Sequence, residues 1–310
     1  MDEADALYTL AAIVDPALGR VRERAQRGRT LEAWGLKPHR ADPGTIMAHD
    51  DGDDYEQKIP EGLRGTVAFP IMNATDALAS IDILITAAAI KRPFNHHAPA
   101  VLSMCRTSIE CSAQAIWVMS PLEQDKRRAR AAGLAKIGIE HAKEFHSDSL
   151  KAHDNGLQRL PDETYAQSRH RLKFHSEELE ILEQLSQENG RRYSILVRKS
   201  ANWIKENPPK HTNETRMVHF PTMATMEYRV CSSFTHGHSW PIDLVGRPSE
   251  MFSMMADALA TALIYTECAV SLFEAQLTDP TSGRTNYYPE RLQPTIDEWR
   301  DLYQKATNSD

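Results

Sequence analysis

Cysteine is scarce in this chain, and no pair of cysteines has the spacing of a metal-binding motif. Only 4 of the 310 residues are cysteine, and none forms a CxxC motif. Each lies in an apolar stretch typical of a helix, which indicates buried, reduced thiols. A zinc site or a disulfide framework is therefore not expected. The cysteines are Cys105, Cys111, Cys231 and Cys268.

The chain also lacks an excess of positive charge and a long apolar run. Its 36 Lys and Arg against 43 Asp and Glu give a formal net charge of −7, so a nucleic acid could be attracted only by a local basic surface. The N-terminal stretch MDEADALYTLAAIVD is acidic, unlike a signal peptide. The longest apolar run, IDILITAAAI, contains Asp82 and is too short to span a bilayer. We expect a cytoplasmic protein with no membrane partner.

Strand patterns and internal repeats are nearly absent, whereas helical periodicity is present over most of the chain. Apolar residues recur every three or four positions, as on one face of a helix. Between residues 27 and 70, prolines, glycines and the acidic run DDGDDYE interrupt this pattern and predict a long irregular connection. The sequence thus predicts an all-α helical bundle of about eight helices with an irregular N-terminal connection.

No linker divides the chain cleanly, but three regions differ in character. Residues 1–70 are predicted to form an N-terminal helix and the irregular connection, both packed on the core. Residues 71–280 form the helical core, in which Asn73 is expected to cap the first helix. Residues 281–310 are expected to add a peripheral C-terminal helix.

One segment of the core, EYRVCSSFTHGHSW (227–240), places polar side chains at helical spacing just before a turn. On a helix over 222–236, a polar face would include Arg229, Ser232, Ser233 and His236. A second, apolar face would include Met223, Met226, Val230 and Phe234. Gly237 suits the left-handed position that closes a helix. His236 would then lie in the last turn, where the helix dipole favours its charged form.

An arginine and a histidine on one helix face suit chemistry on a phosphodiester. A histidine can transfer protons near neutral pH, and an arginine can hold a phosphate by two hydrogen bonds. Arg229 and His236 could thus cleave RNA without a metal, with the 2′-hydroxyl as the nucleophile. Ser232, Ser233 and His238 could support the site.

The segment RVCSSFTH, followed by a turn, resembles the motif helix of the HEPN superfamily of helical proteins. The upstream segment CRTSIECSAQAIWVMSP, with Arg106 and Glu110, resembles a helix of abortive-infection-type members. The resemblance covers roughly residues 70–277. It implies an RNA-cleaving toxin or phage-defence factor with Arg229 and His236 as the catalytic pair. It also implies a homodimer, no cofactor or metal, and a possible antitoxin or regulatory partner.

The Arg–His spacing alone occurs three times, about as often as random placement predicts. The other two pairs are Arg92 with His97, which flank the helix breaker Pro93, and Arg169 with His175 on a highly charged helix. Helix placement and the glycine stop, rather than the spacing, favour Arg229 and His236.

Two further features have alternative interpretations. Arg106 and Glu110 could orient His236 or Arg229, or could form an ordinary ion pair within one helix. A basic run could follow an RNA backbone, or could form a solvated helix face. Its residues are Lys126, Arg127, Arg128 and Arg130.

Two other functions remain open at this point. The same fold could be a non-catalytic interaction module. A metal-dependent phosphohydrolase could instead use histidines and an aspartate as ligands, although no HExxH motif is present. The candidate ligands are His96, His97, His236 and His238, with Asp76 or Asp82.

Overall fold

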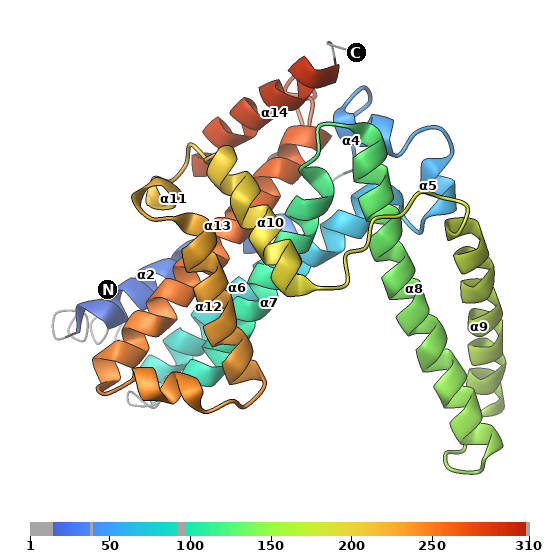
Figure 1. Ribbon diagram of the computed structural model, residues 1–310, viewed down its shortest axis with the longest axis horizontal. Helices are drawn as coiled ribbons and strands as arrows, with labels where there is room; N and C mark the ends of the chain where they lie inside the picture. The colour runs from blue at the N-terminus through green and yellow to red at the C-terminus, as the bar shows by residue number, and fades with distance from the viewer. Residues whose placement is uncertain (1–14, 38–39, 92–96, 308–310) are drawn as a thin grey trace.

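The computed structural model describes residues 15–37, 40–91 and 97–307, and within these ranges every regular element is a helix (Figure 1). The all-α prediction is confirmed. The helices outnumber the predicted eight, partly because several are single turns. The short helices are α3 (Glu32–Gly35), α4 (Ile46–Asp50), α5 (Tyr55–Lys58), α11 (Glu214–Met217), η1 (Trp240–Leu244) and η2 (Glu290–Leu292).

The longer helices gather around α13 (Pro248–Leu277). Residues 255–277 of this helix are almost all buried, which is typical of a helix that is apolar on every side. It packs against helices from both ends of the chain, so α13 forms the centre of the fold. Its main partners are α2 (Pro16–Arg29), α6 (Gly62–Lys91), α7 (Ala98–Met119), α12 (Phe220–Thr235) and α14 (Gln293–Thr307).

Both predicted boundaries of the irregular connection over 27–70 are wrong. Helix α2 continues to Arg29, and α6 begins at Gly62 rather than after Asn73. The carboxylate of Asp51 accepts hydrogen bonds from the backbone nitrogens of Leu63 (2.6 Å) and Arg64 (3.3 Å). This carboxylate satisfies free N–H groups of the first turn of α6, so the helix can begin well before the expected cap.

The C-terminal helix was predicted to be peripheral, but it packs into the core. In α14 the side chains of Ile296, Trp299 and Tyr303 are buried. The Tyr303 hydroxyl lies 3.0 Å from the carbonyl oxygen of Met119 and 2.9 Å from that of Ser120. The end of the chain therefore completes the core next to the C-terminal end of α7.

Two helices extend away from this core. Helices α8 (Gln124–Asp154) and α9 (Asp162–Leu182) lie side by side and project from the rest of the structure (Figure 1). Helix α10 (Tyr193–Glu206) packs against α7 and α12. The four cysteines are free. Three are buried as predicted, whereas Cys111 is only half-buried.

By length and composition alone, α6 (over Gly62–Ala87) and α13 could each cross a membrane. The fold buries 56% of the apolar window of α6 and 94% of that of α13. Burial of this kind is also what a core helix of a water-soluble domain shows.

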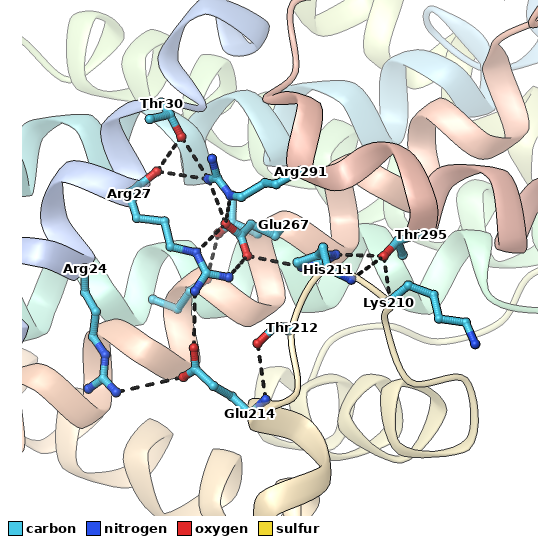
Figure 2. Close-up of polar contacts among 12 residues, drawn as sticks. Arg24, Arg27, Thr30, Lys210, His211, Thr212, Glu214, Glu267, Arg291 and Thr295 are labelled. Atoms are coloured by element: carbon cyan, nitrogen blue, oxygen red, sulfur yellow. Dashed lines mark hydrogen bonds and ion pairs between the residues drawn. The ribbon is translucent and has the colours of Figure 1, made fainter.

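A buried ion-pair cluster joins α13 to three other parts of the chain (Figure 2). Glu267 of α13 is fully buried, and its carboxylate lies 2.8 Å from Nε of Arg27 and 2.8 Å from Nη2 of Arg291. The imidazole Nε2 of His211 lies 3.1 Å from the same carboxylate. Arg27 belongs to α2, Arg291 to η2, and His211 precedes α11. One negative charge thus fixes the relative positions of four segments.

The hydrogen bonds of Thr295 determine the tautomer of His211. The Thr295 hydroxyl accepts from the backbone nitrogens of Lys210 (2.9 Å) and His211 (3.1 Å), which occupies both of its lone pairs. It must then donate its own proton to Nδ1 of His211, 2.8 Å away. His211 therefore carries its proton on Nε2, which faces Glu267.

Opposing effects act on the pKa of Glu267. Burial alone would raise it, but His211 and Arg27 outweigh burial and lower the pKa from 4.5 to about 2. Since the pKa is lower in the folded state, the ionised carboxylate stabilises the fold fully above about pH 4.5. That contribution is lost as the pH falls toward 2.

The variant Glu267→Gln should lose roughly 3–5 kcal/mol of unfolding free energy at pH 7, because it leaves the arginines without their buried counter-charge. Urea denaturation followed by circular dichroism measures this change. The matched control is Glu177→Gln, which removes an exposed carboxylate 3.6 Å from Lys173 and should cost no more than ~0.5 kcal/mol. Equal losses in the two variants would contradict the role assigned to Glu267.

Candidate functional site

The segment 227–240 ends a helix as predicted. Helix α12 stops at Thr235, His236 is the C-terminal cap, and Gly237 adopts a left-handed φ of 70°. The backbone nitrogen of Gly237 donates to the carbonyl of Phe234 (3.2 Å), and that of His238 donates to the carbonyl of Ser233 (2.9 Å). These two bonds form a Schellman motif, which glycine favours because it has no side chain to clash at positive φ.

The apolar face of α12 is rotated relative to the prediction. Met226 was expected in the core, but its residue surface is 59% exposed. Of the other predicted residues, Val230 is buried and Met223 and Phe234 are half-buried against the core, but other buried residues recur along a neighbouring stripe. They are Phe220, Ala224, Tyr228 and Cys231. This rotation places Arg229 on the solvent side of the helix.

The rotation also separates the four residues of the expected polar face. Ser233 is buried, and its hydroxyl accepts a hydrogen bond from the indole nitrogen of Trp240 at 2.8 Å. Ser233 therefore does not lie on an accessible polar face as predicted. Its side chain instead holds η1 against α12. Ser232 is half-buried, whereas Arg229 and His236 are both exposed.

His236 instead meets the second predicted motif, which lies on α7. Nη1 of Arg106 lies 2.9 Å from Nε2 of His236, and Nε of Arg106 lies 2.9 Å from the carboxylate of Glu110. The Tyr228 hydroxyl donates to the same carboxylate at 2.8 Å. The structure thus brings together residues that are 130 positions apart in the chain.

The Arg106–His236 contact determines which imidazole nitrogen of His236 carries the proton. A guanidinium has donors but no acceptor, so Nε2 of His236 must accept. With Nε2 as the acceptor, the ring proton is on Nδ1. The ring of His238 lies 6.1 Å from that of His236, between centroids.

The carboxylate of Glu110 keeps Arg106 charged and Tyr228 protonated behind this contact. Burial alone would lower the pKa of Arg106, but the adjacent Glu110 outweighs it and raises that pKa. Burial, and then the hydrogen bond to Glu110, raise the pKa of Tyr228 well above its ordinary value. Arg106 thus remains a cation and Tyr228 a proton donor near neutral pH.

An open depression of about 520 Å³ lies beside this cluster, between α7 and the end of α12. Its wall includes both members of the Arg106–Glu110 pair, together with Ser103 and Thr235. A phosphate in this depression could reach Arg106. His236 lies next to Thr235 at the end of α12, and its imidazole contacts Arg106.

The proposed RNA-binding role of the basic run 126–130 is contradicted for most of its members. Arg127 is buried in a two-bond ion pair with Asp50 (2.6 and 2.8 Å). Arg128 donates to the carbonyl oxygens of Asp50 (2.8 Å) and Gly52 (2.9 Å), and Arg130 pairs with Glu188. These side chains attach the base of α8 to the core. Only Lys126 of the four is exposed, and it pairs with Glu123 at 2.7 Å.

Among the candidate metal ligands that the structure describes, no three come together. Asp82 is buried and lies 3.3 Å from Arg29, and Asp76 is exposed on α6. His96 lies outside the described residues. Within the parts of the chain that the structure describes, no group of three His, Cys, Asp or Glu is arranged to hold a metal ion.

The second Arg–His spacing has a different environment. Nδ1 of His175 lies 2.8 Å from Glu178 on the same helix, and its ring stacks on His146 with centroids 5.8 Å apart. Arg169 is exposed on α9. Arg92 of the remaining pair lies outside the described residues.

Two glutamates that were not expected from the sequence as notable sites have strongly shifted pKa values. One is Glu267, a single acid within the apolar stretch ALIYTECAVSLF, where a buried charge requires a partner. The other is Glu227 of α12, whose Oε2 is buried without a hydrogen-bond partner. Burial, with a smaller effect of Asp257, raises the pKa of Glu227 from 4.5 to about 7.

Glu227→Gln should stabilise the protein at alkaline pH. The folded state holds the Glu227 proton up to about pH 7, so ionisation increasingly disfavours folding between pH 4.5 and 7. The neutral amide avoids this cost. We expect a gain of roughly 1–2 kcal/mol at pH 8.5 and little change at pH 4, after allowance for partial exposure.

Urea denaturation at the two pH values measures the effect. The control Glu180→Gln makes the same charge change at an exposed position of α9 and should show no such pH dependence. A Glu227→Gln variant that is less stable than wild type at pH 8.5 would show that the carboxylate is stabilised by its surroundings.

A scan against protein-family models found no match to this chain, and searches of curated proteins and of solved structures found no significantly similar protein.

Proposed function

We propose that this protein is a HEPN-like, metal-independent endoribonuclease whose active site lies at the C-terminal end of α12. The observation that supports the proposal best is the 2.9 Å contact between Arg106 and His236. It joins the two separate segments on which the family resemblance rests. It also joins the imidazole to a cation that lines an open depression, and a cation and an imidazole are the groups that cleavage of a phosphodiester requires.

The proposed reaction uses the 2′-hydroxyl of the RNA as its nucleophile. A bound phosphate attracts Arg106 and the exposed Arg229, and so releases Nε2 of His236. Nε2 then accepts the 2′-hydroxyl proton while the 2′-oxygen forms a bond to phosphorus. The bond from phosphorus to the 5′-oxygen breaks, leaving a 2′,3′-cyclic phosphate. We propose that His238 is the general acid, which donates a proton to the departing 5′-oxygen.

Glu110 and Tyr228 are positioning residues in this proposal. The carboxylate of Glu110 accepts from both Arg106 and Tyr228, which restricts the guanidinium to the side that faces His236. We further propose a cytoplasmic homodimer in which the sites of two protomers face each other. A role as a toxin or phage-defence factor, regulated by an antitoxin or another protein, is part of the same proposal.

A non-catalytic interaction module is the second candidate. The observation in its favour is that Arg106 occupies the Nε2 lone pair, the atom that a general base must have free. On this alternative the cluster would only hold α7 against α12.

His236→Ala should reduce cleavage of single-stranded RNA by about 10²- to 10⁴-fold, because it removes the general base. The assay follows a fluorescent RNA in the presence of EDTA, with the wild-type protein cleaving under the same conditions. The control His219→Ala removes an exposed histidine just before the same helix and should retain full activity.

The two candidates predict opposite results for the wild-type protein. Cleavage that survives EDTA and is lost only in His236→Ala supports the nuclease. RNA that stays intact with the wild type, or equal activity in the two histidine variants, would overturn it.

A further inference from the structure

A second cavity lies on another part of the molecule, between α4, the end of α13 and α14. Its volume is about 480 Å³, within the range of sites for small molecules. Ile46 and His49 contribute from α4, Asp279 from the residues after α13, and Arg300 and Gln304 from α14. None of these residues belongs to the proposed nuclease site.

Arg300 is the unusual member of this wall. Its side chain is only 9% exposed, yet Nε has no hydrogen-bond partner. Nη1 donates to the Asp297 carboxylate at 2.8 Å, and that carboxylate is itself 54% exposed. A guanidinium offers five N–H donors, and a buried donor without a partner is costly. This arginine therefore has donors and positive charge that the protein satisfies only in part.

The neighbouring Arg284 has more anionic partners than Arg300, although its Nε is also buried without a hydrogen-bond partner. Arg284 donates to Glu274 (3.0 Å) and to Thr278, and lies 3.5 Å from Asp42. The Thr278 hydroxyl in turn donates to Glu274 at 2.6 Å. Arg284 thus has two carboxylates within 4 Å, whereas Arg300 has one, the exposed Asp297, and a longer-range attraction to Asp279.

The remaining wall suggests what else a ligand would carry. Oδ1 of Asp279 accepts from the backbone and hydroxyl of Thr281, both at 2.8 Å. A carboxylate has further lone pairs, so Asp279 could accept from a hydroxyl or amino group of a ligand. Ile46 and Ala275 supply apolar surface between these polar groups.

We propose that this cavity binds a small organic oxyanion, a carboxylate or phosphate ester that also carries a hydroxyl or amino group. The oxyanion pairs with the guanidinium of Arg300, and the hydroxyl or amino group donates to Asp279. Gln304 and His49 provide further polar contacts at the rim. The proposal does not depend on the nuclease activity, because it concerns separate residues and a separate surface.

Isothermal titration calorimetry of the full chain tests the proposal with three matched probes. Glycerol 3-phosphate and glycerate carry the two oxyanions on similar backbones, and glycerol lacks the charge. We expect saturable binding of one molecule per chain for at least one oxyanion, and none for glycerol. The preferred probe identifies the oxyanion class.

Three variants locate the binding. Arg300→Gln should weaken it at least about tenfold. Ile46→Trp, which fills the cavity from α4 and keeps Arg300, should do the same and covers the case in which Arg300→Gln does not fold. The control Arg247→Gln removes an exposed arginine and should bind as wild type does.

Several results would overturn the proposal. These are no binding of either oxyanion to the wild type, equal binding of glycerol, or undiminished binding in the folded Ile46→Trp variant. RNA cleavage is not measured in this experiment, so its outcome is independent of the proposed nuclease.

Discussion

The need to pair the buried charge of Glu267 constrains the rest of this structure. A carboxylate in the middle of a fully buried helix is tolerated only if cations and hydrogen-bond donors surround it. Arg27, Arg291 and His211 meet that need from three different segments (Figure 2). One charge thus joins α2, η2 and the residues before α11 to α13, in addition to their apolar packing.

The candidate site depends on this arrangement through α7. Helix α13 packs against α7, and α7 in turn packs against α12, so the position of α13 affects how Arg106 meets the end of α12. Glu110 and Tyr228 then hold the guanidinium beside His236. The same contact orients the imidazole and occupies its lone pair, which is why catalysis in our proposal requires a phosphate to attract Arg106 away.

The arginines of the basic run 126–130, which the sequence suggested as RNA contacts, attach the projecting pair α8 and α9 to the core. Their pairing with Asp50 and with Glu188 shows how a local run of positive charge can be satisfied inside a fold. From the sequence these side chains look alike. Their different roles follow from the acidic groups and carbonyl oxygens that come to the base of α8 from distant segments.

The sequence by itself determined the helical class, the glycine stop at Gly237 and the Arg106–Glu110 pair, because these depend on residues within one or two helical turns. Only the tertiary structure decided the start of α6, the burial of Ser233 and Arg127, and the meeting of Arg106 with His236. Each of these depends on a partner from another element or from the neighbouring turn. Local periodicity predicts which residues share a helix face, but the neighbouring helices determine which face is buried.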